Sequence, residues 1–170
     1  SALQRVQTLS ASHDIASVNM SLGGGRYYSA CDNALIASTV EELAGSGIAT
    51  VIASGNNGFS DSVSSPACIS SAVTVGSTTN SDTVSGFSNT AEDLIDLYAP
   101  GSSIISAVPT NSSEAYSGTS MAAPMVAPSE IGSIPYSLQT KLLKEIKLLS
   151  IQNDEIKIRE IKLSEKLKII

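Results

Sequence analysis

The chain has 170 residues, of which 42% are hydrophobic and 4% aromatic, and its formal net charge is -6 at pH 7. This length suits one domain, or one domain with an appendage, and the hydrophobic fraction together with 12 glycines is typical of a loop-rich α/β protein rather than a disordered one. An acidic chain without a basic stripe in its main body argues against nucleic-acid binding, and no apolar run approaches the roughly 20 residues of a membrane span.

The hydrophobic pattern predicts alternating helices and strands along the chain. Helices are expected at residues 2–9 and 34–44 and from Ser120 onward, and strands at residues 15–20, 49–53, 72–75, 94–98 and 104–108. Glycine-rich loops at 21–25 and 54–58 follow the first two strands. This order is typical of a parallel α/β sheet, in which ligand sites gather at the carboxyl ends of the strands. Neither loop matches a nucleotide-binding motif, and both could be simple tight turns.

Three segments taken together carry a specific resemblance. VNMSLGG (18–24), VIASGNNG (51–58) and SGTSMAAP (117–124) occur in this order, with SGFSN (85–89) and YAPG (98–101) between the last two. In sequence and separation they resemble the subtilisin-like serine peptidases, over about residues 1–127. The resemblance implies an α/β, three-layer, parallel-sheet subtilisin-like fold, here incomplete.

The resemblance also implies roles for individual residues. Ser120 is similar to the acyl-forming nucleophile of the family, and Asn56 to the side-chain donor of the oxyanion hole, which acts beside the backbone N–H of Ser120. The implied substrate-binding residues are Ser21, Leu22 and Gly23 on the peptide-pairing edge, Ala53, Ser54 and Gly55 on a pocket wall, and Thr119. These residues also have structural interpretations: Ser120 and Ser21 could cap helices, and Asn56, next to Asn57-Gly58, could simply form part of a turn.

No cofactor is expected for the chemistry, but a structural calcium ion could bind. Asp96 matches a position that helps to hold a cation in some members of the family, with carbonyl oxygens near Ala67 and Ile69 completing the set. Oxygen ligands suit calcium. An acidic residue that merely ends a strand is an equally good interpretation of Asp96.

The chain has two cysteines and one histidine, too few ligands for a tetrahedral zinc site of the usual kind. Cys31 and Cys68 could form a disulfide if the protein is exported, and two unpaired buried thiols are the alternative.

The base and the carboxylate that orients it are missing from the pattern. In the family the aspartate lies in an Asp-[Ser/Thr/Asp]-Gly motif and the histidine in a His-Gly-Thr motif, and neither motif occurs here. His13 is expected to be a surface loop residue. The resemblance therefore implies a fragment of a secreted or extracytoplasmic serine endopeptidase acting on polypeptides, and the isolated chain is expected to be inactive.

The chain departs from the family after Ser120-Met121-Ala122-Ala123-Pro124. Pro128 should end the helix that begins at Ser120, and every lysine lies beyond position 140, so residues 128–170 are expected to be a separate, unrelated tail. Apolar residues repeat there at seven-residue intervals, at Leu142, Leu149, Ile156, Leu163 and Ile170. This favours an amphipathic helix in 138–170 that could self-associate. A frameshift or truncation is the most economical origin of the tail, and a non-catalytic interaction protein with a degenerate peptidase core is the alternative function.

Overall fold

The computed structural model describes residues 1–109 and 111–127. The helices are α1 (Ala2–Ser10), α2 (Ala37–Gly45) and α3 (Thr119–Val126). The strands are β1 (Ser17–Met20), β2 (Gly24–Tyr27), β3 (Ala49–Ala53), β4 (Val63–Ser65), β5 (Val73–Thr78), β6 (Leu97–Pro100), β7 (Ile104–Val108) and β8 (Ser112–Tyr116). The tail predicted at 128–170 lies outside the described residues, and so does the segment predicted to self-associate.

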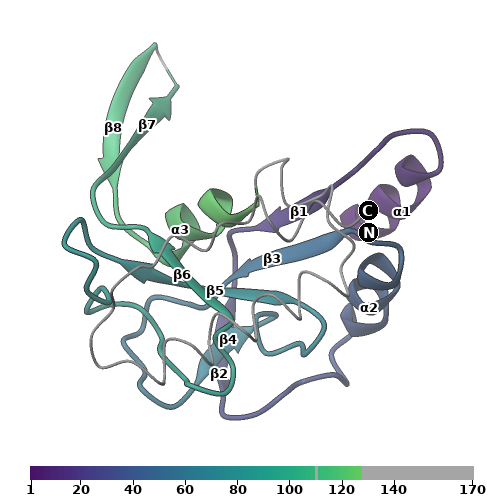
Figure 1. The fold of residues 1–170 in the computed structure, drawn as a ribbon, viewed down its shortest axis with the longest axis horizontal. Coiled ribbons are helices and arrows are strands. Elements are labelled where there is room, and N and C mark those ends of the chain that lie inside the picture. The colour runs from purple at the N-terminus through teal and green to yellow at the C-terminus, as the bar shows by residue number, and fades with distance from the viewer. Residues whose placement is uncertain (110, 128–170) are drawn as a thin grey trace, which may run out of the picture.

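A four-stranded parallel sheet, in the order β1-β3-β5-β6, forms the centre of the fold (Figure 1). Every residue of β3 is buried. Because side chains alternate along a strand, Ile52 packs with Val40 and Leu43 of α2 on one face, while Val51 packs with Ala122 of α3 on the other. Helices therefore cover both faces of the sheet, which confirms the predicted three-layer α/β architecture.

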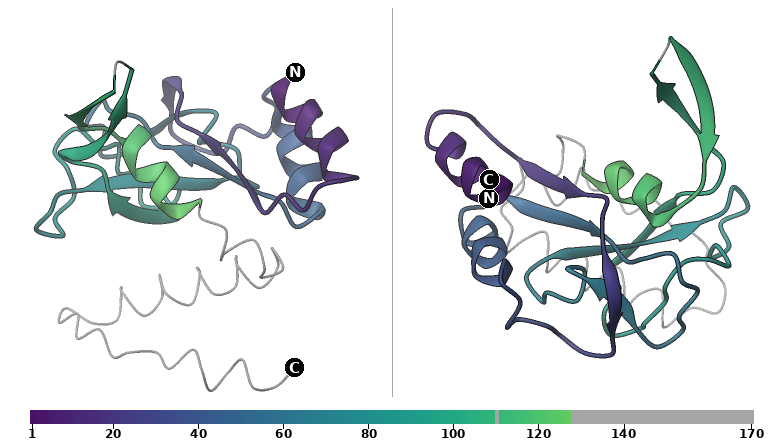
Figure 2. Two further views of the ribbon diagram at one scale, coloured as in Figure 1. Left: turned by 90° about the horizontal axis from the view of Figure 1, so that it is seen from above. Right: turned by 180° about the vertical axis from the view of Figure 1, so that it is seen from behind.

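The helices differ in how closely they approach the sheet. α3 carries Ala122 and Ala123, both fully buried, and these small side chains let the helix lie close against β3, β5 and β6. α1 lies beside α2 in both views of Figure 2 and contacts it directly. None of the helices in the described part of the chain is long and apolar enough to cross a membrane.

Two antiparallel pairs of strands flank the parallel sheet. β2 pairs with β4, and β7 pairs with β8 in a hairpin that projects from the body of the molecule (Figure 1). The strand predicted at 104–108 is confirmed, but its partner is β8 rather than a strand of the parallel sheet. β2, β4 and β8 were not predicted, because their sequences are short and rich in Gly and Ser, which do not favour strands by themselves.

The observed boundaries differ from the predicted ones at element ends. The first strand begins at Ser17 rather than at residue 15, and α2 begins at Ala37 rather than at residue 34. The strand predicted at 94–98 is β6, which begins only at Leu97, because a turn closed by the bond from the N–H of Ile95 to the carbonyl of Ala91 precedes it. Strand β3 occupies the predicted residues.

Cys31 and Cys68 form a disulfide, with their Cα atoms 5.2 Å apart. The bond joins the segment before α2 to the loop after β4, and the N–H of Cys31 also donates to the carbonyl of Cys68. Asp32 strengthens the junction, because its carboxylate accepts hydrogen bonds from the N–H and the hydroxyl of Ser70, both at 2.8 Å. These hydrogen bonds lower the pKa of Asp32, and the bond from the backbone N–H of Ser70 has the largest effect.

Candidate active site

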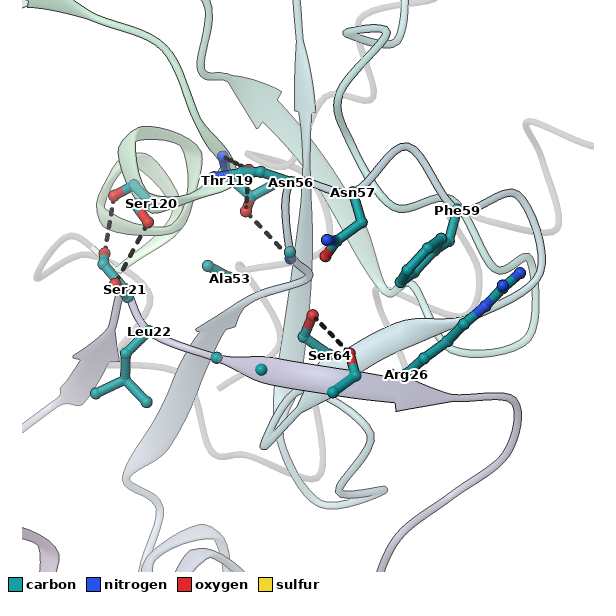
Figure 3. A pocket seen from close by; sticks show the side chains of 14 residues that line it. Ser21, Leu22, Arg26, Ala53, Asn56, Asn57, Phe59, Ser64, Thr119 and Ser120 are labelled. Carbon is teal, nitrogen blue, oxygen red and sulfur yellow. Dashed lines mark hydrogen bonds between the residues drawn. The ribbon is translucent and has the colours of Figure 1, made fainter.

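Ser120 lies in the first turn of α3, which starts immediately after Gly118. The N–H groups of a first helical turn have no acceptor within the helix, and the helix dipole makes this end favourable for negative charge. Two hydrogen bonds tie Ser120 to the end of β1. The hydroxyl of Ser21 donates to the carbonyl of Ser120 (2.8 Å), and the hydroxyl of Ser120 donates to the carbonyl of Ser21 (3.3 Å), as Figure 3 shows.

Asn56 follows β3 and is oriented by Thr119. Its Oδ1 accepts hydrogen bonds from the backbone N–H of Thr119 (2.8 Å) and from the Thr119 hydroxyl (2.9 Å). With the carbonyl end of the amide engaged, Nδ2 is the end left to donate. The fold therefore brings an amide donor next to the residue that precedes Ser120, although the two residues are far apart in sequence.

Gly55 is a position where glycine is required. Its φ is +108°, in the left-handed region, and a Cβ atom there would overlap Ser64 and the side chain of Asn89. Its N–H donates to the hydroxyl of Thr119 (3.2 Å), so Thr119 bonds to both Gly55 and Asn56. The glycine lets the loop turn sharply enough to present Asn56 toward α3.

A pocket of about 660 Å³ opens beside Ser120 (Figure 3). Of the residues predicted to bind substrate, the structure places around it Ser21, Leu22, Gly23, Ala53, Gly55 and Thr119, together with Asn56 and Ser120. Leu22 is 57% exposed although it is apolar, and its neighbours Ser21 and Gly23 are exposed as well. The volume lies within the range typical of small-ligand pockets.

Ser54 does not line the pocket as predicted. Ser54 is fully buried. Its hydroxyl donates to the carbonyl of Asn89, and its own carbonyl accepts from Asn89 Nδ2. Because side chains alternate along the end of β3, Ala53 faces the pocket and Ser54 faces the core.

Further lining residues were missed by the sequence analysis: Gly24, Gly25, Arg26, Asn57, Phe59 and Ser64. Arg26 packs over the ring of Phe59 (4.2 Å from guanidinium carbon to ring centroid) and the ring of Tyr28 (5.0 Å). Its Nη2 donates to Asp61 (2.8 Å), and this bond raises the pKa of Arg26 and lowers that of Asp61. These contacts join β2 to the loop after Asn56, and no local motif in the sequence indicates such a long-range contact.

His13, the one histidine of the chain, is exposed, as predicted. Its Nδ1 lies 2.9 Å from the hydroxyl oxygen of Ser12 and 3.2 Å from the carbonyl oxygen of Leu9, so the imidazole contacts the C-terminal end of α1, which precedes it. The acceptor of the Ser120 hydroxyl is a backbone carbonyl rather than a base.

Asp96 lies just before β6, and its Oδ2 accepts a hydrogen bond from the N–H of Thr74 (2.8 Å). The carbonyl of Ala67 accepts from the Thr74 hydroxyl, and the carbonyl of Ile69 accepts from the N–H of Ala72 (3.0 Å). Each of the three residues of the expected calcium set thus has an oxygen that already accepts a hydrogen bond within the fold. Among the described residues there is no group of three or more His, Cys, Asp or Glu side chains placed to hold a metal ion.

The comparisons with known proteins agree with this geometry. The profile of the Subtilase family matches residues 2–129. Subtilisin-like protease 1 of Arthroderma gypseum is 47% identical over 112 residues, which are 66% of this chain and 22% of that protein. Alkaline protease 1 of Aspergillus clavatus is 43% identical over 113 residues, which are 65% of this chain and 26% of that protein. The chain thus spans about a quarter of the length of these relatives.

Solved structures show the same fold. A cold-adapted subtilisin-like serine proteinase superposes with a TM-score of 0.68 at 37% identity, covering 84% of this chain and 52% of that one. A protease of prenylagaramide maturation superposes with a TM-score of 0.64 at 20% identity, a likeness of fold alone. With the family profile matching most of its length, and with a serine, an amide and a pocket at one end of a parallel sheet, the chain belongs to the subtilase family, the subtilisin-like serine peptidases.

Proposed function

We propose that this chain carries the nucleophile and the oxyanion-binding half of a serine endopeptidase site. The observation that supports this most directly is the pair of hydrogen bonds from Thr119 to Asn56 Oδ1. They leave Nδ2 of Asn56 to donate, beside the first turn of the helix that carries Ser120. A preorganised amide and a backbone N–H are the donors that an acyl-transfer reaction requires where negative charge develops.

In the proposed reaction, Ser120 Oγ attacks the carbonyl carbon of a peptide bond while a base removes its proton. The carbonyl oxygen becomes an oxyanion that accepts from Asn56 Nδ2 and the Ser120 N–H. The C–N bond then breaks, the amine leaves with the proton, and water hydrolyses the acyl ester on Ser120. An extended polypeptide substrate pairs with the backbone edge of Ser21, Leu22 and Gly23, and the side chain before the cleaved bond enters the pocket.

The base is not supplied by the described residues in this proposal. His13 is engaged with Leu9 and Ser12, and Ser120 Oγ donates to the carbonyl of Ser21. A serine hydroxyl without a positioned base is a weak nucleophile. In this proposal the 170-residue chain is therefore inactive by itself, and a base and its orienting carboxylate from another segment or another chain would complete the site.

The test is labelling of the chain with a fluorophosphonate, with and without imidazole as an added base, using Ser120→Ala as the control. We expect no labelling without imidazole, labelling that rises with imidazole concentration, and none in Ser120→Ala. Stoichiometric labelling without imidazole would show that Ser120 is already activated, which contradicts the inactivity. A folded chain that imidazole fails to rescue would contradict the role of Ser120 as nucleophile.

An extracellular or otherwise oxidising location is part of this proposal. The Cys31–Cys68 disulfide supports it, because such bonds persist in exported proteins and are rare in the cytosol. The relatives, a subtilisin-like protease and an alkaline protease, support a polypeptide substrate. Self-association through 138–170, on which the alternative of an interaction protein depends, remains a prediction.

Calcium at Asp96 remains a separate proposal for stability, with no cofactor required for the chemistry. Calcium takes six to eight oxygen ligands. Asp96 and the carbonyls of Ala67 and Ile69 would supply at most four oxygens, of which Asp96 Oδ2 and both carbonyls already accept a hydrogen bond. A titration of the unfolding temperature with calcium, compared between the chain and Asp96→Asn, tests it. A rise of equal size in both proteins would exclude Asp96 as a ligand.

A further inference from the structure

Asn89 is a fully buried amide that the reaction proposed above does not use. It lies at the end of the SGFSN segment, in the loop between β5 and β6. A buried amide must find hydrogen-bond partners, because leaving one polar atom unsatisfied costs about 1–3 kcal/mol. The partners that the side chain of Asn89 finds all belong to one loop.

That loop is the oxyanion loop, residues 54–59, which carries Asn56. Asn89 Oδ1 accepts from the N–H of Asn57 and from the N–H of Phe59, both at 3.1 Å. Its Nδ2 donates to the carbonyl of Ser54 at 2.9 Å, and its backbone N–H donates to the carbonyl of Gly55 at 3.0 Å. The bonds fall on both sides of Asn56 and leave Asn56 itself untouched.

This arrangement fixes the backbone from which the Asn56 side chain extends. Gly55 and Asn57 are the immediate neighbours of Asn56, and both are bonded to Asn89. Thr119 then orients the Asn56 side-chain amide itself, through the two bonds to Oδ1. If the backbone shifted, these two bonds would lengthen and Nδ2 would leave its position near Ser120.

The chemistry of position 89 requires a carboxamide. One oxygen must accept two N–H groups while a donor reaches the Ser54 carbonyl, and only Asn combines both functions at this length. Asp would place a negative oxygen opposite that carbonyl, and Ser is too short to bridge the loop. The approach also depends on Gly55, since a Cβ there would overlap Asn89 Nδ2.

From this geometry we infer that Asn89 is a positioning residue for the oxyanion donor: it holds the oxyanion loop where Thr119 can orient Asn56 toward Ser120. The inference rests on the proposed function for its consequence in binding, but its structural part is testable without any reaction.

The first test measures the mobility of the oxyanion loop by ¹⁵N NMR relaxation on the whole chain. In Asn89→Ala we expect the backbone order parameters of Asn56 and Asn57 to fall from about 0.85, typical of rigid backbone, to below about 0.6. The matched control is Ser85→Ala, which removes a buried hydroxyl bonded to Ser77 and Ser102 but not to the oxyanion loop. It should leave these order parameters unchanged. Unchanged values in Asn89→Ala, or an equal fall in Ser85→Ala, would overturn the inference.

A second variant covers the case in which Asn89→Ala does not fold. Asn89→Asp keeps an oxygen where Oδ1 accepts from Asn57 and Phe59, but loses the donor to Ser54. We expect slow amide exchange of Asn57 and Phe59 to persist in this variant. Fast exchange at both N–H groups, in a protein that remains folded, would contradict the assigned acceptor role.

The second test measures how much more tightly the site binds a negatively charged oxygen than a neutral one, and it requires no base. A short peptide ending in leucine is titrated as its C-terminal acid and as its C-terminal amide, because the acid presents a negative oxygen to the donors of Asn56 and Ser120. We expect the chain to bind the acid about tenfold more tightly, as befits a charge-assisted hydrogen bond. Asn56→Ala should abolish most of this ratio, and Asn89→Ala should lower it at least about threefold.

The double variant separates positioning from a general structural effect. If Asn89 acts through Asn56, Asn89→Ala causes no further loss of the acid-to-amide ratio in an Asn56→Ala background. A further loss there would overturn the inference. A wild-type ratio of one, or a ratio that Asn56→Ala leaves unchanged, would instead refute the proposed oxyanion role of Asn56, while the relaxation measurement still decides whether Asn89 holds the loop.

Discussion

Thr119 bonds to Asn56 twice, through its backbone N–H at 2.8 Å and through its hydroxyl at 2.9 Å. The same hydroxyl accepts from the N–H of Gly55, so one fully buried side chain connects the start of α3 to the end of β3. The helix that carries Ser120 and the loop that carries Asn56 are thereby held together directly, beside the pocket that both residues line.

Thr119→Val should therefore be destabilising although it conserves shape. It removes the hydroxyl donor to Asn56 and leaves the N–H of Gly55 without its acceptor, so we expect a loss of about 1–3 kcal/mol in the free energy of unfolding. Urea denaturation measures the loss. Thr119→Ser is the control, because it keeps the hydroxyl and removes one methyl group, worth about 0.8 kcal/mol. Equal stability of the Val variant and the wild type would argue against this bracing role.

Gly55→Ala should be among the more damaging small substitutions. The new Cβ would overlap Ser64 and Asn89, and alanine would have to adopt a φ of +108°. Strain in such a conformation costs about 1–3 kcal/mol before the overlap is counted, so we expect at least about 2 kcal/mol of destabilisation in thermal or urea unfolding. Gly45→Ala, at the end of α2 with nothing near the added Cβ, should change stability by less than about 1 kcal/mol. If Gly55→Ala left the free energy of unfolding unchanged, the loop would have to relax around the new Cβ atom.

The disulfide should contribute substantially to stability. Cys31 and Cys68 are 37 residues apart, and loop-closure entropy for that separation corresponds to about 4 kcal/mol. The double variant Cys31→Ala, Cys68→Ala should lose about 2–5 kcal/mol by urea denaturation. Alkylation under denaturing conditions checks the bond itself: the mass should stay unchanged without reductant and gain two alkyl groups after reduction. Two alkyl groups gained without reductant would mean that the thiols are unpaired.

Acid should weaken the junction at Asp32. Hydrogen bonds from Ser70 lower the pKa of Asp32 in the folded protein, so its stabilising contribution is present above the pKa of the unfolded chain and is lost as the pH falls through the folded pKa. We expect the unfolding temperature of wild type to fall more between pH 7 and pH 3 than that of Asp32→Asn, which cannot titrate there. Parallel curves would show that other carboxylates carry the acid sensitivity. The effect should be small, because Asp32 is exposed.

Local sequence was enough to predict the central features of the fold. The buried β-branched run at 49–53 became β3 without adjustment, because a strand covered on both faces needs only a short, continuous apolar segment. The glycine-rich loops after β1 and β3 both reached the pocket, since the carboxyl ends of parallel strands meet at one edge of the sheet. Motif order alone indicated Ser120, Asn56 and the neighbouring pocket residues.

The tertiary structure decided the rest. Which of Ala53 and Ser54 faces the pocket depends on the pleat at the end of β3, and whether 104–108 joins the sheet or forms a hairpin depends on the partner strand. Arg26 reaches the loop after Asn56 across 35 positions, and Asn89 reaches the same loop across 32. Contacts between such distant positions leave no local periodicity or motif. The sequence by itself therefore determined the family and indicated Ser120 and Asn56, whereas only the packing of the chain decided which residues hold these two in place.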